Sequence, residues 1–184
     1  MRKISAAFFM SLDGVVEAPD QWHFQYFNDE MGAAIGAAMA KGDAMLLGRV
    51  NYQQWADYWP NQPDEEEFAG FLNNIPKFVV SNTLETATWN NTTLINGDVA
   101  AQIRQLKQQP GKNINMSGSG TLVRWLLVND LLDELHLMVH PVVVGRGQRL
   151  FADQSEQKSL KLIDSQTFST GVVYLTYECD GGAA

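Results

Sequence analysis

The stretch from Lys112 to Gly145 decides the fold that this sequence predicts. It reads KNINMSGSGT over 112–121, LVRWLLVNDLL over 122–132 and DELHLMVHPVVVG over 133–145. The order is a strand, a glycine-rich turn, a helix and a second strand. Gly118 and Gly120 lack a Cβ, so the backbone can turn tightly there and approach a ligand. A helix that begins near Thr121 would point its free N–H groups and positive end at an anion, most often a phosphate.

Strand-like and helical segments alternate along the rest of the chain. Strands are expected over residues 4–10, 43–48, 77–81, 92–95, 112–117 and 135–140, and an antiparallel pair over 160–168 and 172–178. The sequence therefore predicts one domain over residues 1–184. Its expected fold class is a three-layer α/β/α sandwich with a mixed, mostly parallel sheet and an antiparallel C-terminal edge hairpin.

The composition excludes several classes of protein. Of 184 residues, 45% are hydrophobic and 18% charged, which is typical of a soluble globular domain. Thirteen basic residues against 21 acidic ones give a net charge of −8, which disfavours nucleic acid as a partner. No apolar run is long enough for a membrane span. One cysteine, Cys179, excludes an internal disulfide framework and fits the cytoplasm. The three histidines lack a metal-ligand spacing, so no metal site is expected.

Three expected strands end in polar or glycine-rich turns. Ligands of open α/β sheets bind beyond the carboxyl ends of the strands, where such turns would gather. One guanidinium, several hydroxyls and the helix starts suit a ligand with several phosphates, and Asn51 is placed to cap the helix that follows it. A Rossmann domain would carry its glycines on the first strand and is excluded. The turns are Gly48-Arg49-Val50-Asn51, Ser81-Asn82-Thr83 and Ser117-Gly118-Ser119-Gly120-Thr121.

Five motifs follow one another along the chain: SLDG at 11–14, LLGR at 46–49 with Tyr52, VVS at 79–81 with Thr83-Leu84, GSGT at 118–121, and DEL at 133–135 through PVVVG at 141–145 to Leu150-Phe151. In this order, these motifs resemble the dihydrofolate reductase-like superfamily. The most similar branch is the C-terminal reductase domain of the bifunctional riboflavin-biosynthesis deaminase–reductase, with its stand-alone bacterial relatives. The resemblance covers nearly the whole chain, and the ordered set is specific although no single motif is.

The resemblance implies an NADPH-dependent reductase, usually a homodimer, that acts on a pteridine- or pyrimidine-like small molecule. The family-level activity is that of a 5-amino-6-(5-phosphoribosylamino)uracil reductase or a dihydrofolate reductase-like enzyme. The alternatives are an NADP(H)-binding protein that has lost catalysis and a non-enzymatic dimerisation module. The implied cofactor-binding positions are Gly48, Arg49, Asn51 and Tyr52 at the phosphates, Ser81, Asn82 and Thr83 near the adenosine 2′-phosphate, and Ser117, Gly118, Ser119, Gly120 and Thr121 around the pyrophosphate and nicotinamide ribose.

Two positions depart from the family pattern. Asn82 stands where many relatives have Arg, which leaves the choice between NADPH and NADH open. Ser117 precedes Gly118 where riboflavin enzymes commonly carry an acidic residue, which leaves the ribosylaminopyrimidine substrate open.

The nicotinamide is expected beside the end of the first strand, near Met10 to Gly14. Asp13 is the carboxylate best placed there to orient substrate, or to relay a proton if burial raises its pKa. An aspartate that only forms a turn before Gly14 is the alternative. Trp22, Phe27 and Tyr58 could line a pocket for a flat heterocycle, although aromatic residues more often fill a core.

Overall fold

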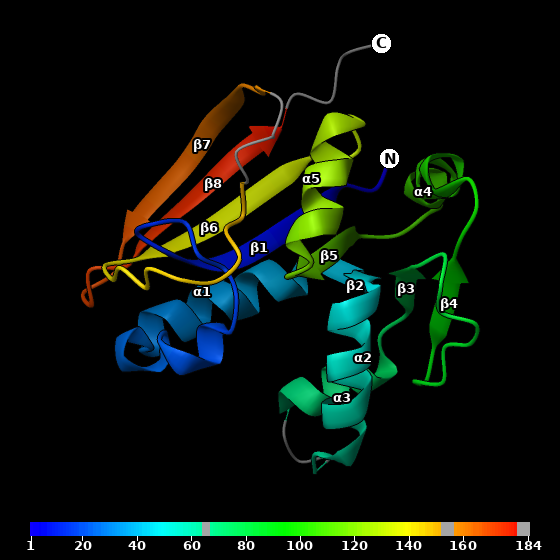
Figure 1. Cartoon of the computed structure of the whole chain (residues 1–184), viewed down its shortest axis with the longest axis horizontal. Helices are drawn as coiled ribbons and strands as arrows, with labels where there is room; N and C mark the ends of the chain where they lie inside the picture. The colour runs from blue at the N-terminus through cyan, green and yellow to red at the C-terminus, as the bar shows by residue number, and fades with distance from the viewer. Residues whose placement is uncertain (64–66, 152–156, 180–184) are drawn as a thin grey trace.

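The computed structural model describes residues 1–63, 67–151 and 157–179, which build an eight-stranded sheet (Figure 1). The strand order is β4-β3-β2-β5-β1-β6-β8-β7. Neighbours from β4 to β6 are parallel, whereas β8 is antiparallel to both β6 and β7. The strands are β1 (Ile4–Ser11), β2 (Gly42–Gly48), β3 (Lys77–Val80), β4 (Thr92–Ile95), β5 (Asn113–Ser117), β6 (Glu134–His140), β7 (Leu160–Thr167) and β8 (Val173–Cys179).

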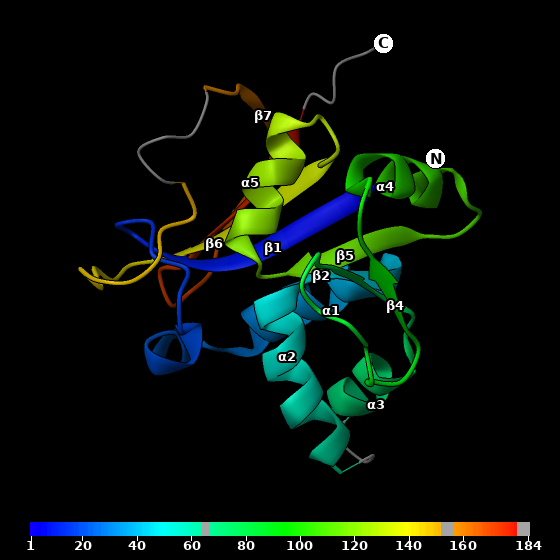
Figure 2. The same ribbon diagram turned by 45° about the vertical axis from the view of Figure 1, so that its right-hand side comes forward.

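Helices cover both faces of the sheet. In Figure 1, α4 and α5 lie above it and α1, α2 and α3 lie below it. Figure 2 shows the same layers after a turn of the molecule. The predicted three-layer sandwich with an antiparallel edge hairpin is therefore confirmed. The helices are α1 (Asp29–Ala40), α2 (Arg49–Tyr58), α3 (Glu67–Asn74), α4 (Val99–Gln108) and α5 (Gly120–Val128), with short 3₁₀ turns η1 (Pro19–Gln21), η2 (Phe24–Tyr26) and η3 (Trp59–Asn61).

The alternation of side chains along the strands creates the two cores. On β2, Leu46 joins the core beneath α4 and α5, whereas Met45 and Leu47 join the core beneath α2 and α3. On β1, Phe8 faces the first core and Phe9 faces the helix α1 side. Because successive residues of a strand point to opposite faces, each central strand is buried on both sides.

Parallel pairing brings the carboxyl ends of six strands to one edge of the sheet. The register aligns Gly48 of β2 with Val80 of β3, and Ser11 of β1 with His140 of β6. Helices α2 and α5 both start at this edge and leave it in opposite directions, one on each face (Figure 1). The strand-end turns predicted from the sequence therefore lie at the same edge.

A buried lysine joins α3 to the sheet. Lys77, at the start of β3, is completely buried, and its Nζ donates to the carbonyls of Leu72 at 2.6 Å and Ile75 at 2.8 Å. The ammonium also lies 4.4 Å from the centre of the Trp89 ring. Burial lowers the pKa of Lys77 to about 8, so the side chain is still mainly charged at neutral pH. The lysine thus supplies donors to the last carbonyls of α3.

None of the helices in the described ranges is long and apolar enough to cross a membrane.

Candidate functional site

The turn at the start of α2 and the turn before α5 are held together by hydrogen bonds. The Ser119 hydroxyl accepts the backbone N–H of Gly48 at 2.8 Å, and the Asn51 amide donates to the Ser117 carbonyl at 2.8 Å. A Cβ on Gly48 would lie 2.8 Å from Ser119 Oγ, so this approach requires glycine. Two of the three predicted turns are therefore in direct contact.

The turn before α5 is shaped by two residues with positive φ. Gly118 has a φ of +84° and Ser119 a φ of +64°, both in the left-handed region that favours glycine. A Cβ on Gly118 would lie 3.4 Å from Asn51 Oδ1. The hydrogen bond from Gly48 holds Ser119 in this conformation, which is strained for a residue with a side chain. The turn consequently exposes backbone rather than a bulky side chain at the sheet edge.

Both helices begin here without a side-chain cap. Gly48 is the N-cap of α2 and Ser119 is the N-cap of α5, and neither side chain hydrogen-bonds to the first turn of its helix. Neither first turn contains an acidic residue. The backbone N–H groups and positive ends of two helices therefore lie at one edge, which favours an anionic ligand with separated charges.

Arg49 adds a cation at the same place. It is the first residue of α2 and is exposed, with Nη1 donating to Gln53 at 3.0 Å. A positive charge at the positive end of a helix is unfavourable unless an anion is nearby. Asn51, in contrast, does not cap α2. That prediction was wrong, because Gly48 takes the cap position and Asn51 lies in the first turn, with its side chain directed to Ser117.

The polar side chains of the third turn form hydrogen bonds within the turn and to the segment after β4. The buried Ser81 hydroxyl accepts the N–H groups of Thr83 at 3.1 Å and Leu84 at 2.9 Å. Asn82 accepts the N–H of Gly97 at 3.1 Å, which ties the end of β3 to the segment after β4. Asn82 and Thr83 are exposed and can still meet a ligand, whereas Ser81 shapes the turn.

Tyr52 lies in the core. It is 3% exposed, and its hydroxyl accepts the backbone N–H of Trp89 at 3.0 Å. It packs in the cluster that also contains Leu72 and Val79. The resemblance implied a cofactor contact for Tyr52, but burial gives it the role of anchoring α2 to the sheet.

Asp13 fixes the loop that follows β6. Its carboxylate accepts the Ser11 hydroxyl at 2.7 Å and the backbone N–H groups of Val144 at 3.0 Å and Gly145 at 2.9 Å. The Arg149 guanidinium lies 3.6 Å away. The hydrogen bond from Ser11 and those from the loop backbone lower the pKa of Asp13 to about 2. A proton relay by Asp13 was predicted only for a pKa raised by burial, and that condition is not met, because the pKa is lowered instead.

Trp22 and Phe27 meet around two histidines. The ring centre of Trp22 lies 5.3 Å from that of His140, and the ring centre of Phe27 lies 6.2 Å from that of His23. His23 stacks on Phe9 at 4.5 Å. This cluster is at the carboxyl ends of β1 and β6, on the α1 face of the sheet.

Tyr58 does not belong to this cluster. It is the last residue of α2, 54% exposed, and its ring packs on Trp59 at 4.9 Å. Helix α2 carries it away from the strand ends (Figure 1). The predicted trio of Trp22, Phe27 and Tyr58 is therefore not assembled, because the sequence could not show in which direction α2 leaves the sheet.

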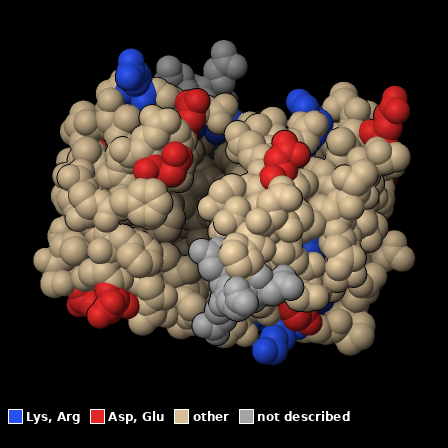
Figure 3. Space-filling view, turned by 90° about the horizontal axis from the view of Figure 1, so that it is seen from below, with Lys and Arg blue, Asp and Glu red and all other residues tan. Residues whose placement is uncertain are grey.

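The space-filling view shows where this side of the molecule is open. Seen from below Figure 1, the surface is hollowed between the half that carries α1 and the half that carries α2 and α3 (Figure 3). Strand β2 contacts both α1 and α2 and so joins the two halves.

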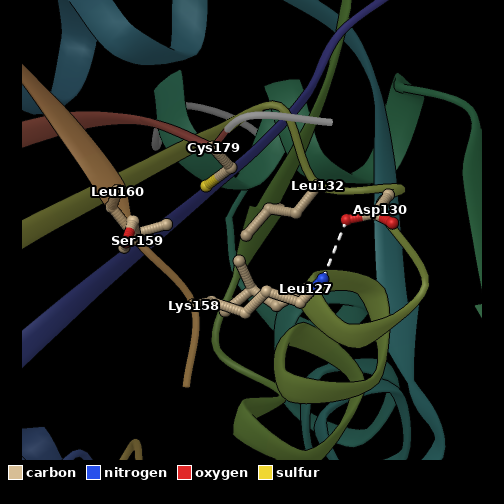
Figure 4. A pocket seen from close by; sticks show the side chains of 7 residues that line it. All are labelled: Leu127, Asp130, Leu132, Lys158, Ser159, Leu160 and Cys179. Carbon is tan, nitrogen blue, oxygen red and sulfur yellow. Dashed lines mark hydrogen bonds and ion pairs between the residues drawn. The ribbon is translucent and has the colours of Figure 1, made fainter. Parts of the chain in front are cut away.

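Two hollows elsewhere on the molecule are not candidate sites. One, of about 10 Å³, has room for about one water (Figure 4). A shallower hollow of about 330 Å³ lies beside Asn73, whose amide is already bonded to Trp59 and Trp89. The small cavity is lined by Leu127, Asp130, Leu132, Lys158, Ser159, Leu160 and Cys179.

In residues 1–63, 67–151 and 157–179, no group of three or more His, Cys, Asp or Glu could hold a metal ion.

The sheet order and the strand-end edge define a dihydrofolate reductase-like fold. Dihydrofolate reductase from Enterococcus faecalis, complexed with NADP(H) and RAB-propyl, is similar with a TM-score of 0.63 at 13% identity, over 96% of this chain and 95% of that one. The chain belongs to the RibD C-terminal domain family, whose model matches residues 2–174.

Two further proteins illustrate the similarity. The uncharacterized protein YyaP of Bacillus subtilis is 30% identical over 184 residues, which is 98% of this chain and 96% of YyaP. The diaminohydroxyphosphoribosylaminopyrimidine deaminase/5-amino-6-(5-phosphoribosylamino)uracil reductase of Thermotoga maritima has a TM-score of 0.67 at 14% identity, covering 97% of this chain and 56% of that one. The latter likeness shows the fold.

Sequence reasoning missed His23 and His140 as members of one site. They were considered only as metal ligands, and their spacing argued against that chemistry. The signal that could have found them is the position of each beside an expected ligand edge, one within the aromatic loop and one at the end of a strand.

Proposed function

We propose that this protein is an NADPH-dependent reductase that transfers a hydride to a planar pteridine- or pyrimidine-like small molecule. The observation that carries the proposal is the pair of uncapped helix starts at the ends of β2 and β5, with the exposed Arg49 beside them. Membership in the RibD C-terminal domain family supports it. So does the similarity of fold to a dihydrofolate reductase complexed with NADP(H).

The chain's own residues would bind and orient the cofactor. The first turn of α2 and Arg49 would hold phosphate oxygens through N–H groups and a guanidinium. The Gly118–Thr121 turn lets the backbone approach the pyrophosphate, since Gly118 has no side chain there. The exposed Asn82 and Thr83 would face the adenosine end. When bound, NADPH supplies the hydride, while the protein supplies position and dryness.

Asp13 would act as a positioning residue for the substrate side. Its carboxylate holds the N–H groups of Val144 and Gly145, and thereby keeps the loop after β6 against the turn after β1. Both segments border the expected nicotinamide position. The reacting ring would therefore meet a preformed wall instead of a mobile loop.

Replacing Arg49 with alanine tests the cofactor proposal. We expect the Kd for NADPH to rise at least ten-fold, because hydrogen bonds to charged groups contribute about 1.5–3 kcal/mol. The Kd is measured by titration of NADPH fluorescence. Arg104→Ala on α4 changes the net charge equally at an exposed position and should bind like the wild type. Equal affinity of the Arg49 variant, or no binding by the wild type at submillimolar NADPH, would refute the cofactor reading.

Substrate tests separate an enzyme from a protein that only binds the cofactor. Oxidation of NADPH is followed with dihydrofolate and with the ribosylaminopyrimidine. Binding without turnover of either would favour the alternative in which catalysis has been lost, an alternative that the exposed Ser117 motivates.

We also propose that the protein forms a homodimer through the edge strand β7. Leu162 and Ile163 are 49% and 47% exposed at an irregularity in the pairing of β7 with β8, and β7 has β8 as its neighbour on one side. Exposed apolar edge strands are sites of self-association. Light scattering coupled to size exclusion should give twice the mass of one chain for the wild type and a monomer for Ile163→Lys. A wild-type monomer at high concentration would contradict this proposal.

A further inference from the structure

Two buried imidazoles at the ends of β1 and β6 each present a ring nitrogen without a hydrogen-bond partner. His140 is completely buried and His23 is 7% exposed. Nε2 of His140 and Nδ1 of His23 have no partner among the described residues. The rings approach at 6.1 Å between centres, nearly perpendicular to each other. A buried polar atom that stays unpaired weakens the fold, so two at one place point to a ligand.

The tautomer of His140 is fixed by its own strand. Its Nδ1 lies 2.8 Å from the Met138 carbonyl, which can only accept, so Nδ1 carries the proton. Burial lowers the pKa of the ring, with the carbonyls of Met138 and Met10 acting in the opposite direction. In the resulting neutral imidazole Nε2 is a hydrogen-bond acceptor. It therefore fits an N–H group of a ligand.

His23 supplies a group that can donate or accept. Burial and the neighbouring His140 lower its pKa, and Asp20 acts in the opposite direction. No ion pair joins a carboxylate to either ring in the described part of the chain, so the pair suits an uncharged ligand. Phe9 and Phe24 flank His23 at 4.5 Å and 4.2 Å between ring centres. These ring contacts hold the His23 imidazole beside His140.

The segment 18–27 covers the pair and has few hydrogen bonds to the rest of the molecule. Its backbone N–H donors at Gln21, Trp22, His23, Tyr26 and Phe27 all bond to carbonyls within the segment. Its side chains reach outside through Trp22 to the Glu17 carbonyl at 3.1 Å and through Tyr26 to the Pro141 carbonyl at 3.4 Å. Ring contacts of Trp22 and Tyr26 with His140, and of His23 with Phe9, also hold the segment, so it can lift to admit a ligand to His140 only when these contacts open.

We propose that His23 and His140 form the polar end of the substrate site and read the N–H edge of an uncharged planar heterocycle, with segment 18–27 as its cover. This inference rests on the proposed function, and names the chemistry by which that site would select its substrate. A ring with an N–H group beside a carbonyl on one edge matches this pair. Its N–H would donate to Nε2 of His140, and its carbonyl would accept from His23.

The test uses the full chain saturated with NADP⁺ and two matched probes. The probes are 5,6-diaminouracil and its 1,3-dimethyl derivative, which has the same ring without ring N–H groups. We expect 5,6-diaminouracil to shift the imidazole nitrogen resonances of His23 and His140 and to leave those of His136 unchanged. We expect the dimethyl derivative to bind at least ten-fold more weakly.

Replacing His140, and with it the unpaired Nε2, separates a binding role of this residue from a structural one. His140→Leu removes the unpaired Nε2 but also the hydrogen bond from Nδ1 to the Met138 carbonyl, so the Tm is measured to show that the variant is folded. It should weaken 5,6-diaminouracil at least ten-fold with an unchanged Kd for NADPH. His136→Gln is the matched control on the same strand face, since His136 is already bonded to Tyr174 and Thr176. It should bind the probe like the wild type.

The outcomes distinguish this inference from the proposed function. If NADPH binds but 5,6-diaminouracil does not bind, binds His140→Leu equally, or leaves both histidine resonances in place, the inference is wrong and the reductase proposal stands. If NADPH itself does not bind, the proposed function fails first.

Discussion

A Lys77→Met variant is expected to lose about 3 kcal/mol of unfolding free energy. Methionine keeps the apolar stem but leaves the carbonyls of Leu72 and Ile75 without a buried donor. Each unsatisfied buried acceptor costs about 1–3 kcal/mol, and the helix end also loses a compensating cation. The contact with the Trp89 ring disappears as well. The loss is measured by urea unfolding at pH 7.

An exposed lysine at another helix end provides the control. Lys112 donates to the Ala40 carbonyl at the end of α1 at 3.3 Å, on the surface. Lys112→Met should cost less than about 1 kcal/mol, because water can replace the lost donor. If both variants lose the same unfolding free energy, the burial of Lys77 does not increase the contribution of its hydrogen bonds to stability.

The second large effect concerns the loop fixed by Asp13. In Asp13→Asn, one carboxylate oxygen becomes a donor that cannot accept the N–H of Val144 or Gly145. We expect the hydrogen exchange of the amide that faces the new NH₂ group to accelerate at least about ten-fold, since its native acceptor is lost. Affinity for a substrate analogue should fall with the order of the loop. Asp57→Asn, an exposed change on α2, should leave the two amides protected.

The pH dependence of this protection shows whether the charge of Asp13 matters. The folded pKa of Asp13, about 2, lies below its ordinary value of 3.8. The carboxylate therefore stabilises the folded loop above about pH 4, and the contribution is lost as the pH falls from 4 towards 2. The difference between wild type and Asp13→Asn, compared at equal pH, should shrink over that window. A difference that stays constant down to pH 2 would argue against an ionic role.

Local patterns were enough to predict the layers of the fold and the edge where the candidate site lies. The turns that contain Gly48, Arg49 and Gly118 were placed at one edge because each follows a strand of a parallel sheet, and the structure brings these two turns into contact. Their role in binding a cofactor stays a prediction. Asn51 was mistaken for a cap because the sequence does not show at which residue the helix begins. Helix α2 begins at Arg49, so Gly48 is its N-cap and Asn51 lies inside the first turn.

The remaining errors share a cause, which is contact between distant parts of the chain. Asp13 meets Gly145 across 132 residues, and the backbone donors of that loop add to the Ser11 hydroxyl in lowering its pKa. His23 and His140 meet only because β1 lies beside β6. Neither spacing nor composition could reveal such partners, so the chemistry of the substrate side had to come from the structure.

The position of β1 in the sheet has a consequence for how the chain folds. β1 is made first during synthesis, yet its two neighbours are β5 and β6, and the register pairs Ile4 with Ile114 and Ala6 with Leu135. The conformational entropy of these large loops is lost before the strand pairs contribute any stability, so folding is slow. The apolar strand β1 meanwhile stays unpaired. The contact between Gly48 and Ser119 needs β5 in the same way. A nascent chain that stops before residue 113 therefore lacks both neighbours of β1 and the contact between Gly48 and Ser119 at the candidate site.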